Sequence, residues 1–316
     1  MEDKMLNFEI TQDIMKEVNK TVIGKENIVR KVLTAIIAKG HILIEDIPGV
    51  GKTTLALAFS KVMNLEYNRL QFTPDVLSTD VIGYHVITRD GELGDYKQGP
   101  VVCNLFLADE INRTSSKTQS ALLEVMEEGS VTVDGITMQV PKPFTVIATQ
   151  NPVGSIGTHM LPESQLDRFM IRLSMGYPDV AGEIRMLKDR NGENPLSKMK
   201  EVVSREDILT MQQQAEKIYV NDSIYEYLVK LILMTRRDPY VELGVSPRGS
   251  IALLNMAKAN AYINGRDFLV PDDIRSIFYD IISHRIILKP EARVNNVSLE
   301  QVSKGILKQV QAPKIG

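Results

Sequence analysis

The stretch "ILIEDIPGVGKTTLALAF", residues 42–59, constrains the fold of this chain more than any other. A short apolar run comes before its glycine-rich segment, and an apolar pattern of helical period follows. This order predicts a buried strand, a tight loop and a helix, which is the context of a phosphate-binding loop. The glycines let backbone N–H groups turn toward phosphate oxygens, and the helix N-terminus adds the positive end of its dipole. The stretch therefore predicts an α/β fold that binds a nucleotide.

The residue types of this loop indicate individual roles. Lys52 is expected to lie against the β- and γ-phosphates of the nucleotide, and Thr53 to place its hydroxyl on Mg²⁺. The first position of the usual motif, G-x-x-x-x-G-K-[ST], holds Asp46 instead of glycine. We expect phosphate to be held by Gly49–Thr53, with Asp46 tolerated if its carboxylate points away from the phosphates and harmful if it points toward them. The residues expected to contact nucleotide in this loop are Asp46, Pro48, Gly49, Val50, Gly51, Lys52, Thr53 and Thr54.

Residues 40–175 alternate short apolar runs with helical patterns. Apolar runs without alternation are typical of a parallel sheet that is covered on both faces. The pattern predicts parallel strands with helices between them, in an α/β arrangement with right-handed crossovers. The expected strands are His41–Glu45, Tyr67–Gln71, Val101–Asp109, Phe144–Thr149 and Met170–Ser174.

Two predicted hairpin inserts and a switch from alternating strands and helices to helices alone complete the predicted organisation. Residues 84–99 and 131–140 each carry Asp-Gly between strand-like runs, which favours a hairpin because a type I′ turn needs positive φ at both central residues. From residue 177 onward, helices dominate. The predicted domains are therefore a nucleotide-binding core, 1–176, and a smaller helical domain, 177–316. Helix starts are expected at Ser204, at Asn221 or Asp222, at Ser246–Pro247 and at Pro271.

Polar side chains follow two of the predicted strands where each strand ends. Asp109 and Glu110 close the run "CNLFLADE", and Asn151 follows "FTVIATQ". The carboxyl ends of parallel strands meet at the edge where such sheets bind ligands, so these residues are expected near the phosphate loop. Asp109 is expected to hold Mg²⁺, Glu110 to polarise the attacking water as general base, and Asn151 to orient that water. The structural alternatives are a strand-end cap for the acidic pair and a turn-initiating Asn-Pro for Asn151.

Two arginines complete the candidate site. Arg168 in "LPESQLDRFM" is expected at a helix end just before the fifth strand, and Arg248 in "GVSPRGS" in the first turn of a helix. A guanidinium suits the spread negative charge of phosphoryl transfer. A cation near a helix N-terminus meets the unfavourable end of the dipole, so Arg248 is oddly placed for a purely structural role. The alternative for each is a surface or salt-bridged arginine.

Charge and cysteine content narrow the classes of function. The 316 residues carry a formal net charge of −3, which gives no global electrostatic basis for binding nucleic acid. Cys103 is the only cysteine, which excludes an intramolecular disulfide, and it is expected to be a small buried apolar residue. The N-terminal segment has no signal-peptide core, and no apolar run reaches the roughly 18 residues of a membrane helix. We therefore expect a cytoplasmic protein without membrane insertion.

Together these motifs resemble the AAA+ ATPases and, within them, the MoxR-type family, over nearly the whole chain. The segments "LIEDIPGVGKTTLA" and "LFLADEINR" resemble the Walker A and Walker B elements, "IATQNP" sensor 1, "LPESQLDRF" the arginine-finger segment and "SPRG" sensor 2. The phrases "QFTPDVLSTDVIG" and "ADEINRTSSKTQSALLEVMEEGSVTVDG" are specific to MoxR-type proteins. The segment "VIGKENIV" looks like the one that lines the adenine pocket, which adds Ile23 and Gly24 to the expected nucleotide contacts. The resemblance implies an AAA+ P-loop core, a parallel five-stranded αβα sandwich, followed by an all-α lid domain.

The same resemblance implies Mg²⁺-dependent hydrolysis of ATP to ADP in a homo-oligomeric ring, generally a hexamer, with nucleotide between subunits. Arg168 would act on ATP bound to the neighbouring subunit, and Arg248 would contact nucleotide in its own subunit or across the interface. The two inserts would face the ring pore. Proteins of this type are thought to act like chaperones that mature partner complexes, often with proteins bearing von Willebrand A domains.

Two alternative functions stay open. One is a nucleotide-dependent scaffold with little turnover, and the other is a metal-chelatase-type motor subunit, which shares both inserts. The MoxR-specific phrases favour the remodelling ATPase over the chelatase.

Overall fold

The computed structural model describes residues 8–47, 49–151, 160–178, 180–189 and 195–314. Its centre is a sheet of five parallel strands in the order β2-β5-β8-β1-β9. These are β1 (Ile42–Glu45), β2 (Tyr67–Gln71), β5 (Leu105–Asp109), β8 (Thr145–Gln150) and β9 (Ile171–Leu173). Because the strands are parallel, the residues that follow β1, β5 and β8 emerge at one edge of the sheet. The predicted α/β fold and its five strands are confirmed.

The predicted third strand begins too early. Residues 101–104 form a turn before β5, in which the Cys103 N–H donates to Val101 O at 2.9 Å. The Asn104 side chain donates to Pro143 O, also at 2.9 Å. Such local contacts satisfy a buried apolar run without a strand partner, which is why hydrophobicity alone misplaced the boundary. Cys103 itself is buried, as predicted.

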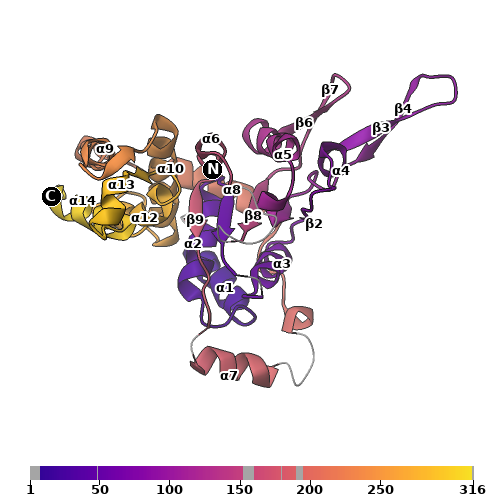
Figure 1. Ribbon diagram of the computed structural model, residues 1–316. Coiled ribbons are helices and arrows are strands. Elements are labelled where there is room, and N and C mark those ends of the chain that lie inside the picture. Colours follow the sequence, from indigo (N-terminus) through magenta and orange to yellow (C-terminus); the bar gives the residue numbers. More distant parts are fainter. Residues whose placement is uncertain (1–7, 48, 152–159, 179, 190–194, 315–316) are drawn as a thin grey trace.

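Two apolar clusters cover the two faces of the sheet, because alternate residues of a strand point to opposite faces. Ile42 and Ile44 of β1 belong to a cluster with α1 (Phe8–Asn19), α2 (Glu26–Ile37) and α3 (Lys52–Val62). Leu43, between them, belongs to a cluster with α4 (Ser78–Ile82) and α5 (Ser116–Glu128). The sheet is therefore the middle layer of an αβα sandwich (Figure 1).

Both predicted inserts are hairpins that project from the body on the same side (Figure 1). The first pairs β3 (Gly83–Ile87) with β4 (Leu93–Gln98), and the second pairs β6 (Ser130–Val133) with β7 (Ile136–Gln139). In the second turn, Asp134 and Gly135 both have positive φ, 51° and 79°, as a type I′ turn requires. In the first, only Gly91 of the Asp-Gly pair has positive φ, and the Thr88 N–H donates to Glu92 O at 2.9 Å across a longer loop. The hairpin prediction holds in both inserts, and the type I′ turn in the second.

Helices make up most of the chain after β9. Side chains cap α8, α9 and α10 at Ser204, Asn221 and Ser246, as predicted. The helix predicted to start at Pro271 is split, since the Asn260 side chain donates to Asp273 O at 3.3 Å and takes a carbonyl that a continuous helix would use. The elements of this part, with α6 before β9, are α6 (Glu163–Leu166), α7 (Val180–Asp189), a 3-10 turn (Pro195–Lys198), α8 (Arg205–Glu216), α9 (Asp222–Arg237), β10 (Val241–Leu243), α10 (Pro247–Ile263), α11 (Pro271–Arg275), α12 (Phe278–Ile282), β11 (Ile287–Leu288), α13 (Pro290–Val294) and α14 (Leu299–Gln309).

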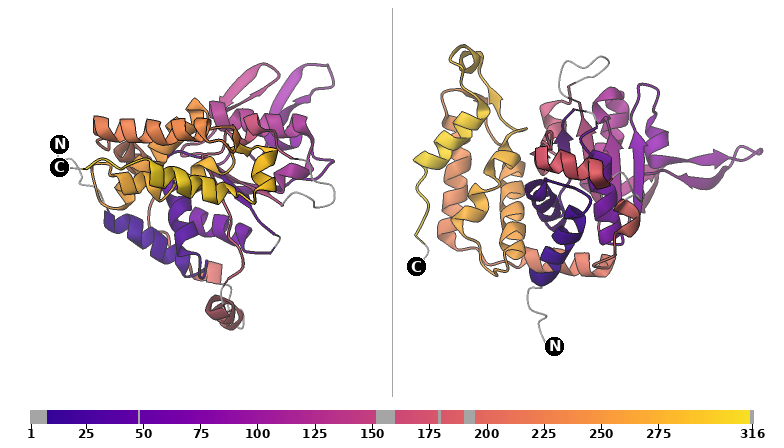
Figure 2. Two further views of the ribbon diagram at one scale, coloured as in Figure 1. Left: turned by 60° about the vertical axis from the view of Figure 1, so that its left-hand side comes forward. Right: turned by 90° about the horizontal axis from the view of Figure 1, so that it is seen from below.

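The helical part packs directly against the N-terminal helices. One continuous apolar cluster contains Val18 of α1, Val32 of α2 and Leu253 of α10, and Figure 2 shows α1 and α2 beside the helices of the C-terminal part. The boundary predicted after residue 176 stays a prediction. Among the described residues, no helix has the length and apolarity that crossing a membrane requires.

Candidate functional site

The phosphate loop connects β1 to α3 through two glycines in the left-handed region. Gly49 and Gly51 have φ of 86° and 96°, which other residues adopt only with strain. The loop lines a pocket of about 320 Å³. Of the predicted contacts, the pocket wall includes Ile23, Gly49, Val50, Gly51 and Thr54. The predicted contacts that do not line this pocket are Gly24, Asp46, Lys52, Thr53 and Arg248, and Pro48 lies outside the described residues.

Lys52 begins α3 and is largely buried. Its Nζ donates to the backbone oxygen of Asp46 at 2.7 Å. Burial lowers the pKa of Lys52, and the nearby carboxylates of Asp109, Asp46 and Glu110 oppose that shift. The structure thus brings the predicted phosphate-binding cation close to the predicted metal ligand and general base.

The Asp46 carboxylate points away from the glycines of the loop. Its Oδ2 accepts from the Ser174 hydroxyl at 3.0 Å and from the Gly176 N–H at 2.6 Å, and its Oδ1 from the Ile47 N–H at 2.9 Å. The side chain is buried, with the residue 7% exposed. This is the orientation in which a carboxylate at the first position was expected to be tolerated.

Asp109 closes β5 with both carboxylate oxygens engaged. The Thr149 hydroxyl donates to Oδ1 at 2.6 Å, and the Arg69 guanidinium binds Oδ2 at 2.6 Å. Thr149 also accepts the Glu110 N–H at 2.9 Å, so one buried hydroxyl from β8 positions both acids. Carboxylate oxygens are ligands that Mg²⁺ prefers, so the chemistry of Asp109 fits the predicted magnesium ligand. Thr53 lies in the first turn of α3, and its role as the second ligand stays a prediction.

Glu110 has positive φ, 59°, which is unusual for a residue with a long side chain. Its Oε1 accepts from the Asn151 side-chain amide at 3.1 Å, and its Oε2 pairs with Arg113 at 2.7 Å. Burial raises the pKa of Glu110, but the hydrogen bonds from Arg113 and Asn151 outweigh it, so the pKa is lowered. The carboxylate is therefore charged at neutral pH, as a general base must be, and the predicted pair of Glu110 and Asn151 lies in direct contact.

The backbone of Asn151 is held by Asn112, a buried residue in the turn after Glu110. The Asn112 side chain donates to Asn151 O at 3.2 Å and accepts the Asn151 N–H at 3.4 Å. This double contact connects the end of β8 to the turn after β5. The Glu110 carboxylate and the Asn151 side-chain amide are therefore held in a fixed position relative to each other.

The two predicted arginines lie together, away from this cluster. Arg168 pairs with Glu127 of α5 at 2.7 Å and donates to Leu123 O, also at 2.7 Å. Arg248 binds the other oxygen of the same Glu127 carboxylate. Arg168 follows α6, which lies at the opposite end of the molecule from α7, whose residues line the phosphate-loop pocket (Figure 1). Within one subunit, therefore, the structure does not bring either arginine to the phosphate loop.

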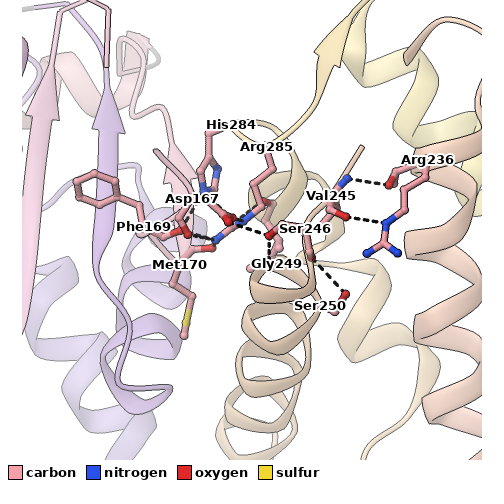
Figure 3. A network of polar contacts seen from close by, with 12 residues as sticks. Asp167, Phe169, Met170, Arg236, Val245, Ser246, Gly249, Ser250, His284 and Arg285 are labelled. Atoms are coloured by element: carbon pink, nitrogen blue, oxygen red, sulfur yellow. Dashed lines mark hydrogen bonds and ion pairs between the residues drawn. The ribbon is translucent and has the colours of Figure 1, made fainter. Parts of the chain in front are cut away.

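A buried network fixes the backbone that carries these arginines (Figure 3). The Arg285 guanidinium donates to Asp167 Oδ1 and to Phe169 O, each at 2.6 Å. The other carboxylate oxygen of Asp167 accepts from the Ser246 hydroxyl at 2.7 Å, and Ser246 caps α10. Asp167 is adjacent to Arg168, and Ser246 lies two residues before Arg248, so one carboxylate joins the two arginine-bearing segments.

Sequence reasoning missed most of these supporting residues. For some of them the sequence carries only a weak signal. Arg69 and Gln71 are polar side chains in a strand that was predicted to be buried, and Asn112 is a polar residue shortly after the acidic pair. Contacts far apart in sequence, such as that between residues 167 and 285, leave no local pattern. The supporting residues that were missed are Arg69, Gln71, Asn112, Arg113, Glu127, Thr149, Asp167 and Arg285.

Known proteins resemble the chain along almost its full length. Residues 41–171 match the ATPase family associated with various cellular activities (AAA), and residues 233–305 match the AAA lid domain. Chaperone MoxR1 of Mycobacterium tuberculosis is 37% identical over 95% of this chain and 81% of its own length. The uncharacterized protein YeaC of Bacillus subtilis is 46% identical over 95% of this chain and 93% of its own. The crystal structure of a candidate ATPase from Cytophaga hutchinsonii superimposes with a TM-score of 0.90 at 37% identity, covering 97% and 96% of the two chains. The fold, the order of the site elements and these relatives together show that the chain belongs to the MoxR-type AAA+ ATPase family.

Proposed function

We propose that this protein hydrolyses ATP with Mg²⁺ in a ring of identical subunits and uses the energy to remodel partner protein complexes. The observation that carries the hydrolytic part is the contact between Glu110 and Asn151 at the edge of the sheet where Lys52 and Asp109 also lie.

In this proposal, the loop amides and Lys52 bind the phosphates, and Thr53 and Asp109 hold Mg²⁺, which would neutralise phosphate charge when bound. Glu110, which is charged at neutral pH, accepts a proton from the attacking water. Asn151 lies against Glu110 at 3.1 Å and would orient the same water.

The arginines supply the missing half of the site from a neighbouring subunit. Arg168 and Arg248 share Glu127 on the face of α5, distant from their own phosphate loop, so both are suited to a γ-phosphate presented by the next copy. This favours an interface role for Arg248, which the sequence alone left open. A closed ring, which we propose to be a hexamer, would give every phosphate loop such a neighbour.

Remodelling requires a surface that engages other proteins. The first hairpin exposes the apolar side chains of Tyr84, Ile87 and Leu93, of which Ile87 is 72% exposed. Such side chains suit transient contacts with client proteins, including complexes that contain von Willebrand A domains. The relative named as a chaperone supports this part of the proposal. The proposed place of action is the cytoplasm.

The test of hydrolysis is a matched set of variants. Wild-type protein should release phosphate from ATP only with Mg²⁺. Glu110→Gln should bind ATP as the wild type does and turn over about 100-fold more slowly or worse, because general-base catalysis is typically worth 10²–10⁴. Lys52→Ala should lose ATP binding itself. Wild-type turnover in Glu110→Gln would remove Glu110 from the role of base.

One contact favours a second candidate, a nucleotide-dependent scaffold with little turnover. Arg113 pairs with Glu110 at 2.7 Å, and a carboxylate held this way is less able to accept a proton from water. Turnover per subunit with and without cell extract separates the two functions. A scaffold should stay slow in both, and should show no gain in Arg113→Ala.

A further inference from the structure

The segment that leads from β9 to α7, residues 174–178, is held to the phosphate-loop region at two points. At one end, the Ser174 hydroxyl and the Gly176 N–H donate to the Asp46 carboxylate, at 3.0 and 2.6 Å. At the other, Lys25 donates to Tyr177 O at 2.7 Å. Asp46 lies at the first position of the phosphate-loop motif, where the usual glycine has no side chain and could make neither of the first two contacts.

This segment forms one wall of the nucleotide pocket. Met175 and Pro178 line the pocket together with Gly182 and Met186 of α7, and residues 21–23 and 25 line the wall before α2. The glycines of the phosphate loop line the pocket as well. The pocket is therefore lined both by the backbone of the phosphate loop and by the apolar side chains of Met175, Pro178 and Met186, of which Met175 lies beside Gly51. Apolar side chains of this kind suit the base and ribose of a nucleotide.

We propose that Asp46 is a positioning residue for the nucleoside-binding wall and makes no direct contact with phosphate. Its carboxylate fixes residues 174–176, and through them Met175, against the base and ribose. The proposal rests on the ATP-binding function inferred above and adds to it the part of the ligand on which Asp46 acts. It explains why a negative charge at the first position of the motif is compatible with a phosphate site: the carboxylate is turned toward the segment after β9 and accepts hydrogen bonds there.

The test compares a ligand that has both nucleoside and phosphates with one that has phosphates alone. Affinities for Mg·ATP and for Mg·tripolyphosphate are measured by calorimetry or competition in wild type and in Asp46→Ala. We expect Asp46→Ala to bind ATP about three- to tenfold more weakly, in line with the loss of hydrogen bonds to a charged group. Tripolyphosphate carries no nucleoside, so its affinity should stay within about twofold of wild type.

Two variants control for charge and for folding. Ser174→Ala removes one donor and keeps the Asp46 charge, so it should weaken ATP alone, by less than Asp46→Ala does. Asp46→Asn removes the charge and keeps a side-chain oxygen at the same position, so ATP binding should lie between wild type and Asp46→Ala. Thermal unfolding of each variant confirms that it is folded, and Ser174→Ala provides the test if Asp46→Ala is not.

The other outcomes overturn the proposal in distinguishable ways. An equal loss of ATP and tripolyphosphate would place Asp46 in the phosphate site, and a gain for both would mean that its carboxylate repels phosphate. Unchanged ATP affinity in both Asp46→Ala and Ser174→Ala would show that the contact does not shape the wall. If the wild type binds neither probe, the ATP-binding function fails, and the positioning role fails with it.

Discussion

The phosphate side and the arginine side of this subunit are built on different principles. On the phosphate side, Lys52, Asp109, Glu110 and Asn151 lie close together because parallel strands end at one edge. Other side chains of the same edge hydrogen-bond to them or shift their pKa. On the arginine side, Arg168 follows α6 and Arg248 lies in α10, and they are brought together by Glu127 and by the buried Asp167–Arg285 pair.

This difference supports the proposal that one chain carries two incomplete halves of a site. In that proposal the phosphate side binds nucleotide and activates water, yet neither Arg168 nor Arg248 of the same subunit reaches it. The arginine side has cations held in place by a carboxylate and no phosphate-binding loop. In the proposed ring, two neighbouring copies supply what each half lacks, and the halves can therefore be tested separately by mixing variants.

The largest expected effect is the loss of ATP turnover in Arg168→Ala. This variant should bind ATP but hydrolyse it at least about 100-fold more slowly than wild type, since arginine fingers of other enzymes raise kcat by 10³–10⁵. Mixed with Lys52→Ala subunits, which keep Arg168 but cannot bind ATP, activity should return and peak near equal proportions. Steady-state phosphate release across mixing ratios measures this.

The matched control for mixing is Glu110→Gln. Glu110→Gln and Lys52→Ala both damage the phosphate side, so a mixture of these two variants should stay inactive. A mixture of Glu110→Gln with Arg168→Ala should recover activity. Arg248→Ala should complement Lys52→Ala as Arg168→Ala does. If it does not, Arg248 serves its own subunit and the two-sided division is wrong for that residue.

An intermediate effect is expected on stability when the buried pair of the arginine side is broken. Asp167→Ala leaves the Arg285 guanidinium, whose side chain is 2% exposed, without its carboxylate, and should lower the free energy of unfolding by about 3 kcal/mol. The control is Glu300→Ala, which breaks an exposed ion pair with Lys304 at the same 2.6 Å distance and should cost less than about 1 kcal/mol. Urea unfolding measures both, and equal losses would mean that burial does not distinguish the pairs.

The smallest expected effect is the pH dependence of stability that His41 causes. This residue contacts both α5, which carries Glu127, and β8, which ends near Glu110. This buried histidine contacts Met126 O, next to Glu127, at 2.9 Å, and its Nδ1 accepts the Val146 N–H of β8 at 3.0 Å. Burial lowers the pKa of His41 to about 4, against 6.5 for a free side chain. Its contribution to stability is therefore present above pH 6.5 and is lost as the pH falls toward 4.

Between pH 6.5 and 5.5 this amounts to about 1 kcal/mol, given 1.36 kcal/mol for each pKa unit. The measurement is urea unfolding of wild type and His41→Gln at several pH values, because the carboxylate contributions cancel in the difference. A difference that does not change with pH would exclude protonation of His41 as the cause.

The sequence predicted the phosphate side far better than the arginine side. A glycine-rich loop, an acidic pair and an Asn-Pro each follow a strand, so their residue types and the parallel sheet were enough to place Lys52, Asp109, Glu110 and Asn151 together. Arg168 and Arg248 were found as residues, but Glu127 sits in an ordinary helix and gave no sign that both would bind it. Contacts such as that of Asp167 with Arg285 depend on how distant helices dock, which residue patterns do not encode.

Glu110 is in the left-handed region, which disfavours L-residues with a β-carbon by roughly 1–2 kcal/mol, whereas glycine or asparagine would adopt it at lower cost. A chain optimised for stability alone would have one of those residues between β5 and the turn after it. Replacing Glu110 by one of those residues would relieve the backbone strain but would remove the carboxylate that this backbone directs at Asn151, so the position is expected to exchange stability for chemistry.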